Sequence, residues 1–168
     1  NGGAPPLTIG AATVSLAQDG GATALGDLNI VATAIKTTGA LTTGDQTYDG
    51  FVTLDGAYEA ANLTADAALL GGDVTIDAAA NASLGSGDGA HDLAIGADAV
   101  ALGATGAATA LASLNVDAAS IEMADGASVS GAATLTGPAS LGGAFDVGSL
   151  GAGAIQLAND LSIDAAGA

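Results

Sequence analysis

The chain has 168 residues, of which 18 are Asp or Glu and only one is Lys or Arg, so its formal net charge is −17. Binding to nucleic acid or to an anionic membrane requires clustered cations. We therefore expect the chain neither to bind nucleic acid nor to insert into a membrane. The absence of cysteine excludes disulfide scaffolds, thiolate metal sites and cysteine nucleophiles. Glycine and alanine make up about 42% of the chain, against two Phe and two Tyr, which predicts a thin, regular core of small side chains.

The first residues do not have the pattern of a secretory signal peptide. Residues 1–6 carry no basic side chain, and no long apolar run follows them. Gly, Thr or Asp interrupts every apolar stretch, so no transmembrane helix is expected. We interpret the chain as a mature or excised segment.

An apolar–polar–apolar triplet recurs along the chain. Its copies begin 19 to 28 residues apart and are Leu7-Thr8-Ile9, Leu28-Asn29-Ile30, Val52-Thr53-Leu54, Val74-Thr75-Ile76, Leu93-Ala94-Ile95, Leu114-Asn115-Val116, Ala133-Thr134-Leu135 and Leu161-Ser162-Ile163. Period-two alternation between Gly, Asp and Asn turns predicts strands of three to five residues with one buried face, despite the helix propensity of alanine. We therefore predict an all-β parallel β-solenoid of about eight coils, in which each coil's strands pair with those above and below.

A longer repeat contains the triplets. Residues 7–35 match residues 93–121 at 15 of 29 positions, an offset of 86. We interpret the chain as a single domain, 1–168, made of two copies of a four-coil super-repeat, about 7–92 and about 93–168.

Residues 43–54, Thr-Gly-Asp-Gln-Thr-Tyr-Asp-Gly-Phe-Val-Thr-Leu, resemble the TGxQTYxGxVTL unit of filamentous-haemagglutinin-like bacterial surface repeats. Residues 72–76, 89–95 and 109–116 are similar to the following pieces of that unit, in the same order. The second copy departs from it, since residues 125–131 lack the Gln and the Tyr. The resemblance implies a right-handed parallel β-helix, exported to the cell surface, in very long adhesin-like or fibrous proteins.

Aspartates supply the candidate metal ligands. Asp73 and Asp92 precede the triplets of successive coils and should stack about 5 Å apart, where two carboxylates repel unless they splay, bind a cation such as Ca²⁺, or meet His91. Asp88, in Gly85-Ser86-Gly87-Asp88-Gly89, is a third Ca²⁺ candidate, although the motif occurs once. The alternative for all three is a turn or solvated role, and no other metal or cofactor site is predicted.

No catalytic residue is predicted. His91 is the sole histidine and has no nucleophile or metal partner at a recognisable spacing. Lys36 should lie at the surface, Asn29 and Asn115 should face outward, and ice binding would need more Thr-x-Thr than the single Thr134-Leu135-Thr136. Tyr48, Phe51 and Tyr58 either form an exposed patch or pack over a coil corner or end.

The sequence therefore predicts a structural, non-enzymatic module of an extracellular or cell-surface fibre, with coils stacking end to end within or between chains. The alternative is an adhesin module that recognises a glycan or a protein surface through loops on one face. Residues 55–68 and 135–160, where the copies differ most in length, would be those loops. A polysaccharide-degrading β-helix is a weaker third option, because its groove would need the Arg, Lys and aromatic residues that this chain largely lacks.

Overall fold

The computed structural model describes residues 4–19 and 23–166, and within these ranges the chain is all-β, with no helix. Its strands are β1 (Leu7–Asp19), β2 (Leu28–Leu41), β3 (Gln46–Asp88), β4 (Asp92–Thr105), β5 (Ser113–Met123), β6 (Ala127–Thr136), β7 (Ala139–Ala152) and β8 (Ile155–Ala165).

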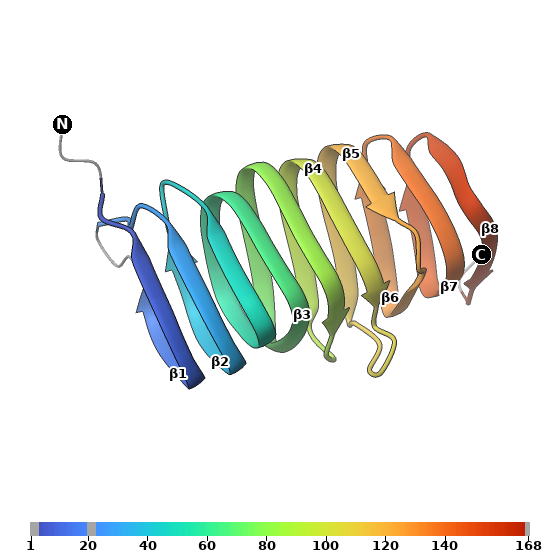
Figure 1. Ribbon diagram of the computed structural model, residues 1–168. Helices are drawn as coiled ribbons and strands as arrows, with labels where there is room; N and C mark the ends of the chain where they lie inside the picture. The colour runs from blue at the N-terminus through green and yellow to red at the C-terminus, as the bar shows by residue number, and fades with distance from the viewer. Residues whose placement is uncertain (1–3, 20–22, 167–168) are drawn as a thin grey trace.

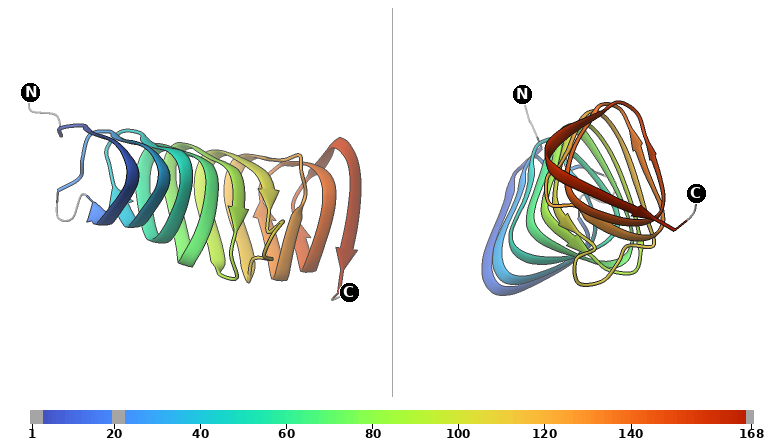
Figure 2. Two further views of the ribbon diagram at one scale, coloured as in Figure 1. Left: turned by 60° about the horizontal axis from the view of Figure 1, so that its bottom comes forward. Right: turned by 90° about the vertical axis from the view of Figure 1, so that its right-hand side faces the viewer.

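Successive strands pair in parallel, so the sheet order follows the chain order from β1 to β8. The stack forms a β-solenoid of about nine turns with β1 and β8 at opposite ends (Figure 1). Viewed along the axis, the coils have a rounded, roughly triangular outline (Figure 2). The predicted fold class is confirmed, with one coil more than expected.

The coils are shorter and the strands longer than predicted. Leu7 pairs with Leu28, 21 residues on, but Ala139 pairs with Ile155 after only 16 residues. The strands have at least 10 residues rather than three to five, and β3 has 43. The reason is that the backbone ladder continues through most corners, where small residues let neighbouring coils approach closely. At Gly137, for example, φ is +124° and a Cβ would collide with the carbonyl oxygen of Ala118 in the preceding coil.

The interior is filled by the apolar members of the alternating pattern. In β5, Leu114 and Val116 are buried and Asn115 points outward, as predicted, and Asn29 in β2 does the same. Because paired residues share an orientation, each interior side chain lies on the equivalent side chain of the next coil, as in the ladder Ile76–Ile95–Val116–Leu135.

The 86-residue repeat is not four coils long, which corrects the predicted super-repeat. One column passes once through each successive coil and consists of Asp27, Asp45, Asn62, Asn81, Ala99 and Ser120. Four turns from Asp27 thus reach Ala99 and five reach Ser120. A shift of 86 residues reaches Ser113 instead, which lies in a different column, beside Asp92. The repeat therefore carries a segment from one face of the solenoid to a neighbouring face.

Candidate functional site

The last described coil exposes side chains whose partners in the coil before it are buried. Leu141 of β7 is fully buried, whereas its partner Leu157 in β8 is 72% exposed. Likewise Phe145 is 2% exposed and its partner Ile163 is 45% exposed. These β8 residues continue the interior columns, so their exposure follows from their position at the end of the stack.

The first coil is open in the same manner, although less so. Leu7 and Ile9 of β1 pack against the core but remain partly exposed, whereas their partners Leu28 and Ile30 in β2 are fully buried. Within the described residues β1 pairs only with β2 and β8 only with β7. Each outer strand therefore presents an unpaired backbone edge together with an apolar surface, which is the combination that accepts another parallel strand.

Asp73 and Asp92 occupy equivalent positions in successive coils, as predicted. The backbone N of Asp92 donates to Oδ1 of Asp73 at 3.2 Å, and Oγ of Ser113, one coil further on, donates to Oδ1 of Asp92 at 2.7 Å. Nδ1 of His91 lies 3.7 Å from Oδ1 of Asp73. The predicted contact of His91 is thus present with Asp73.

Asp88 contacts a different part of the chain from Asp73 and Asp92. Its Oδ1 accepts hydrogen bonds from the backbone N of Ala108 at 2.8 Å and of Thr109 at 3.4 Å, and so holds the connection between β4 and β5. It does not join Asp73 and Asp92 in one site. No group of three or more His, Asp or Glu side chains that could hold a metal ion occurs within 4–19 and 23–166.

The aromatic residues separate into interior and surface positions. Tyr48 and Tyr58 are buried inside the coils with an edge-to-face ring contact at 6.4 Å, whereas Phe51 is 48% exposed. The two tyrosines thus belong to the core rather than to an exposed patch, and they lie in its interior rather than over a corner or end.

A buried polar cluster surrounds these tyrosines, and sequence reasoning missed it. Gln46, fully buried, donates through Nε2 to the backbone oxygens of Glu59 at 2.7 Å and Ala40 at 3.2 Å and to Oγ1 of Thr42 at 3.3 Å. Its Oε1 accepts from the Tyr48 hydroxyl at 3.1 Å. The available signal was the alternation of Gln46-Thr47-Tyr48, which places Gln46 where the neighbouring coil has Leu28.

Tyr58 extends the cluster toward β2. Its hydroxyl donates to the backbone oxygen of Thr37 at 2.8 Å and accepts from the backbone N of Asp55 at 3.1 Å. Burial raises the pKa of Tyr58 above its ordinary value of 10.0, and the Asp55 carboxylate adds to the rise, while the hydrogen bonds offset part of it. The hydroxyl is therefore held in its neutral, donating form.

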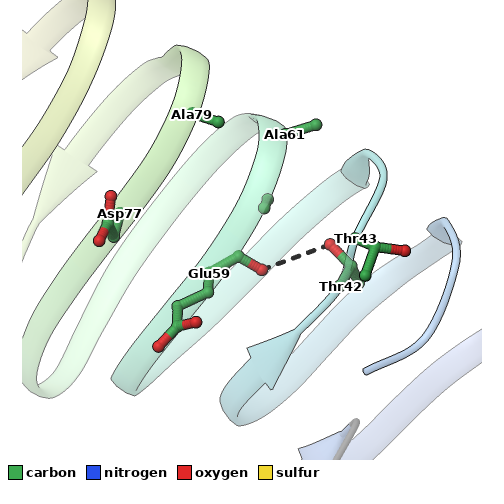
Figure 3. A pocket seen from close by; sticks show the side chains of 7 residues that line it. Thr42, Thr43, Glu59, Ala61, Asp77 and Ala79 are labelled. Carbon is green, nitrogen blue, oxygen red and sulfur yellow. Dashed lines mark hydrogen bonds between the residues drawn. The ribbon is translucent and has the colours of Figure 1, made fainter. Parts of the chain in front are cut away.

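The outer surface offers shallow hollows. One of about 360 Å³ lies beside Thr43, with Glu59, Asp77 and three alanines in its lining (Figure 3). The hydroxyl of Thr42, which also lines the hollow, donates a hydrogen bond to the backbone oxygen of Glu59 at 3.3 Å. A lining of carboxylates and methyl groups, with neither an aromatic ring nor a cation, gives no platform for stacking a sugar.

The remaining predictions about the surface have different outcomes. Lys36 is exposed, as expected. Thr134 stacks between Asn115 and Gly151, so its Thr-x-Thr triplet is not repeated in the adjacent coils. The two predicted binding loops are not loops: residues 55–68 lie within β3, and residues 135–160 are mostly β7 and β8.

Acidic side chains are distributed around the solenoid rather than gathered on one face. Asp73 and Asp92 form one axial pair, and Asp146 and Asp164 form another in a different ladder near the far end. Glu59 and Asp77, on neighbouring coils, form a third (Figure 3).

No family model, curated protein or solved structure matches the chain. The part of the chain that the structure describes contains no helix long and apolar enough to cross a membrane. The fold itself thus defines the class of protein, a parallel β-solenoid.

Proposed function

We propose that the chain is a non-enzymatic structural module of an exported cell-surface fibre, in which coils continue end to end within one chain or between chains. The observation that carries this proposal is the exposure of interior positions at β8, where Leu157 and Ile163 prolong the ladders of Leu141 and Phe145. A further coil placed there would bury them as each earlier coil is buried. The resemblance of residues 43–54 to exported bacterial surface repeats supports the location.

The ladders suit a load-bearing role. Backbone hydrogen bonds between parallel strands run along the axis in every coil, so the stack resists extension and bending. The net charge of −17, spread over several columns, keeps neighbouring rods apart in solution. A structural fibre module is also favoured over an adhesin module, because the two segments expected to form binding loops are strands.

Electron microscopy of the purified chain at neutral pH, with and without a calcium chelator, tests the proposal. One chain of about nine turns should measure about 4 nm along its axis at a strand spacing of about 4.8 Å. We expect rods several times longer, whose length grows with protein concentration. Uniform particles about 4 nm long at all concentrations would contradict joining between chains and leave a longer chain as the source of the fibre.

A matched pair of variants distinguishes the ends from the sides. Leu157→Asp places a charge on the open coil and should shorten the rods to single particles. Phe51→Asp places the same charge at an apolar residue on the side of the stack, 48% exposed, and should leave rod length unchanged. Equal shortening by both variants would show that general repulsion, rather than the end surface, controls assembly.

A further inference from the structure

We propose that the buried polar cluster of Thr42, Gln46, Tyr48 and Tyr58 selects the register in which the coils stack. This inference concerns how the chain finds one fold and holds whether or not the chain forms fibres. The sequence by itself leaves the register of the coils ambiguous. The triplets of different faces are nearly interchangeable, and the 86-residue repeat places Leu28-Asn29-Ile30 over Leu114-Asn115-Val116, although these lie in different columns.

Apolar burial alone cannot resolve this ambiguity. A slip by one residue would turn apolar side chains outward, and is strongly disfavoured. A slip by one whole face is different, because it sets one apolar–polar–apolar triplet upon another and keeps the same side chains inside. In the native register Leu28 pairs with Gln46 and Ile35 with Val52. After a slip by one face, Leu28-Asn29-Ile30 would lie on Val52-Thr53-Leu54, which fits the apolar pattern better than Gln46-Thr47-Tyr48.

The polar cluster opposes that slip because two of its hydrogen bonds join β3 to the preceding strand β2. Gln46 Nε2 reaches the backbone oxygen of Ala40, near the end of β2, at 3.2 Å, and that of Glu59, later in its own coil, at 2.7 Å. Tyr58, in turn, reaches back to Thr37 at 2.8 Å. A slip of β3 along β2 would separate Tyr58 from Thr37 and Gln46 from Ala40, because these two bonds join β3 to β2.

The energetic discrimination comes from desolvation. A buried amide or hydroxyl without a partner costs about 1–3 kcal/mol, whereas an apolar side chain carries no such penalty of its own and only leaves its former backbone partners unsatisfied in the native register. Gln46 and Tyr58 therefore add little to stability when satisfied but penalise every stacking that separates them from their partners. Buried polar groups are known to fix registry elsewhere in this way. The second copy of the sequence repeat lacks the Gln and the Tyr, so the register is selected near the β2–β3 boundary and passed along the stack.

Engineered disulfides test the proposal cleanly, because the chain contains no cysteine. Asn29→Cys with Thr47→Cys reports the native register, since these positions pair between β2 and β3. Asn29→Cys with Thr53→Cys reports the register slipped by one face. Neighbouring parallel strands are about 4.8 Å apart, a separation that a disulfide spans.

In the otherwise unchanged chain we expect only the native pair to oxidise. In a chain carrying Gln46→Leu and Tyr58→Phe we expect the yield of the slipped disulfide to rise at least about tenfold and the native yield to fall. Leu114→Met is the control, because it alters a fully buried apolar residue of β5 that pairs with Leu93 and Ala133 rather than with the cluster, and it should leave both yields unchanged.

Two results would overturn the proposal. The first is a double variant that still forms the native disulfide alone, at the original yield, which would show that apolar packing sets the register. The second is a double variant that loses its β-sheet circular dichroism, since the proposal requires the alternative stacking to be folded. Tyr58→Phe alone, which removes one hydroxyl, should give a smaller rise in the slipped disulfide than the double variant.

Discussion

The interior of the solenoid differs between its first and second halves. Around β2 and the start of β3 the core contains Gln46, Tyr48 and Tyr58: Gln46 bonds to Tyr48 and to Glu59 within β3, and Tyr58 bonds across to Thr37 in the preceding coil. Between β5 and β7 the equivalent space is apolar, with residues such as Leu114 and Phe145. Both halves bury their side chains equally well, so the polar half is not needed for burial. The difference teaches that in a self-similar stack, burial supplies stability and buried hydrogen bonds supply a unique arrangement.

The apolar half should be the more sensitive to loss of volume. Leu114 is buried between Leu93 and Ala133 of the adjacent coils. Leu114→Ala should lower the free energy of unfolding by about 2–5 kcal/mol, since neighbours on a regular ladder relax little into the cavity. Urea titration followed by circular dichroism measures it. Asn115→Ala, the exposed neighbour, should change stability by less than about 0.5 kcal/mol, and an equal loss there would refute the packing argument.

The polar half should respond to loss of a single hydroxyl. Tyr58→Phe keeps the ring but leaves the backbone oxygen of Thr37 and the backbone N of Asp55 without their partner. We expect a loss of about 1–3 kcal/mol in the free energy of unfolding. A change near zero would mean that water replaces the hydroxyl and that the cluster is less closed than its contacts indicate.

Alkaline pH should weaken the polar half specifically. The pKa of Tyr58 is raised in the folded state, so the folded chain holds its proton more tightly than the unfolded chain. Stability therefore falls as pH rises above about 10 and stops falling only above the folded pKa, by at most about 1.4 kcal/mol per pH unit from this group. Unfolding titrations between pH 9 and 11 should show a steeper decline for the native chain than for Tyr58→Phe, and parallel curves would exclude Tyr58 as the source.

The smallest effect is expected at Thr37. Within 4–19 and 23–166, its Oγ1 is the one buried side-chain polar atom that lacks a hydrogen-bond partner. Thr37→Val keeps the shape and removes that hydroxyl, so stability should stay within about 0.5 kcal/mol or rise slightly. A loss above 1 kcal/mol would assign the hydroxyl a role in positioning Tyr58.

Much of this architecture could be predicted from the sequence. Alternation in triplets such as Leu93-Ala94-Ile95 predicts the strands, and their spacing predicts the stack, because burying one face of a strand is a local requirement. The exact number of coils could not be predicted, because triplets on different faces look alike. Pairing the most similar triplets therefore matches positions that are not equivalent in the solenoid, and the spacing between them is not the length of one coil. The buried hydrogen bonds of Gln46 and Tyr58 could not be predicted, because a buried polar group is recognised only from partners that are distant in sequence, such as Glu59 and Thr37.

The incommensurate repeat has a consequence for how such a molecule can grow. Duplicating a segment that is not a whole number of turns long places each copied surface feature on the next side of the rod. Successive copies of that feature then follow a helical path around the axis. Residues 7–35 and 93–121 are related in this way. A chain extended by further duplications of this length would show similar chemistry in every direction around its axis. Neighbours in a crowded layer would then meet equivalent surfaces whatever the rotation of the rod.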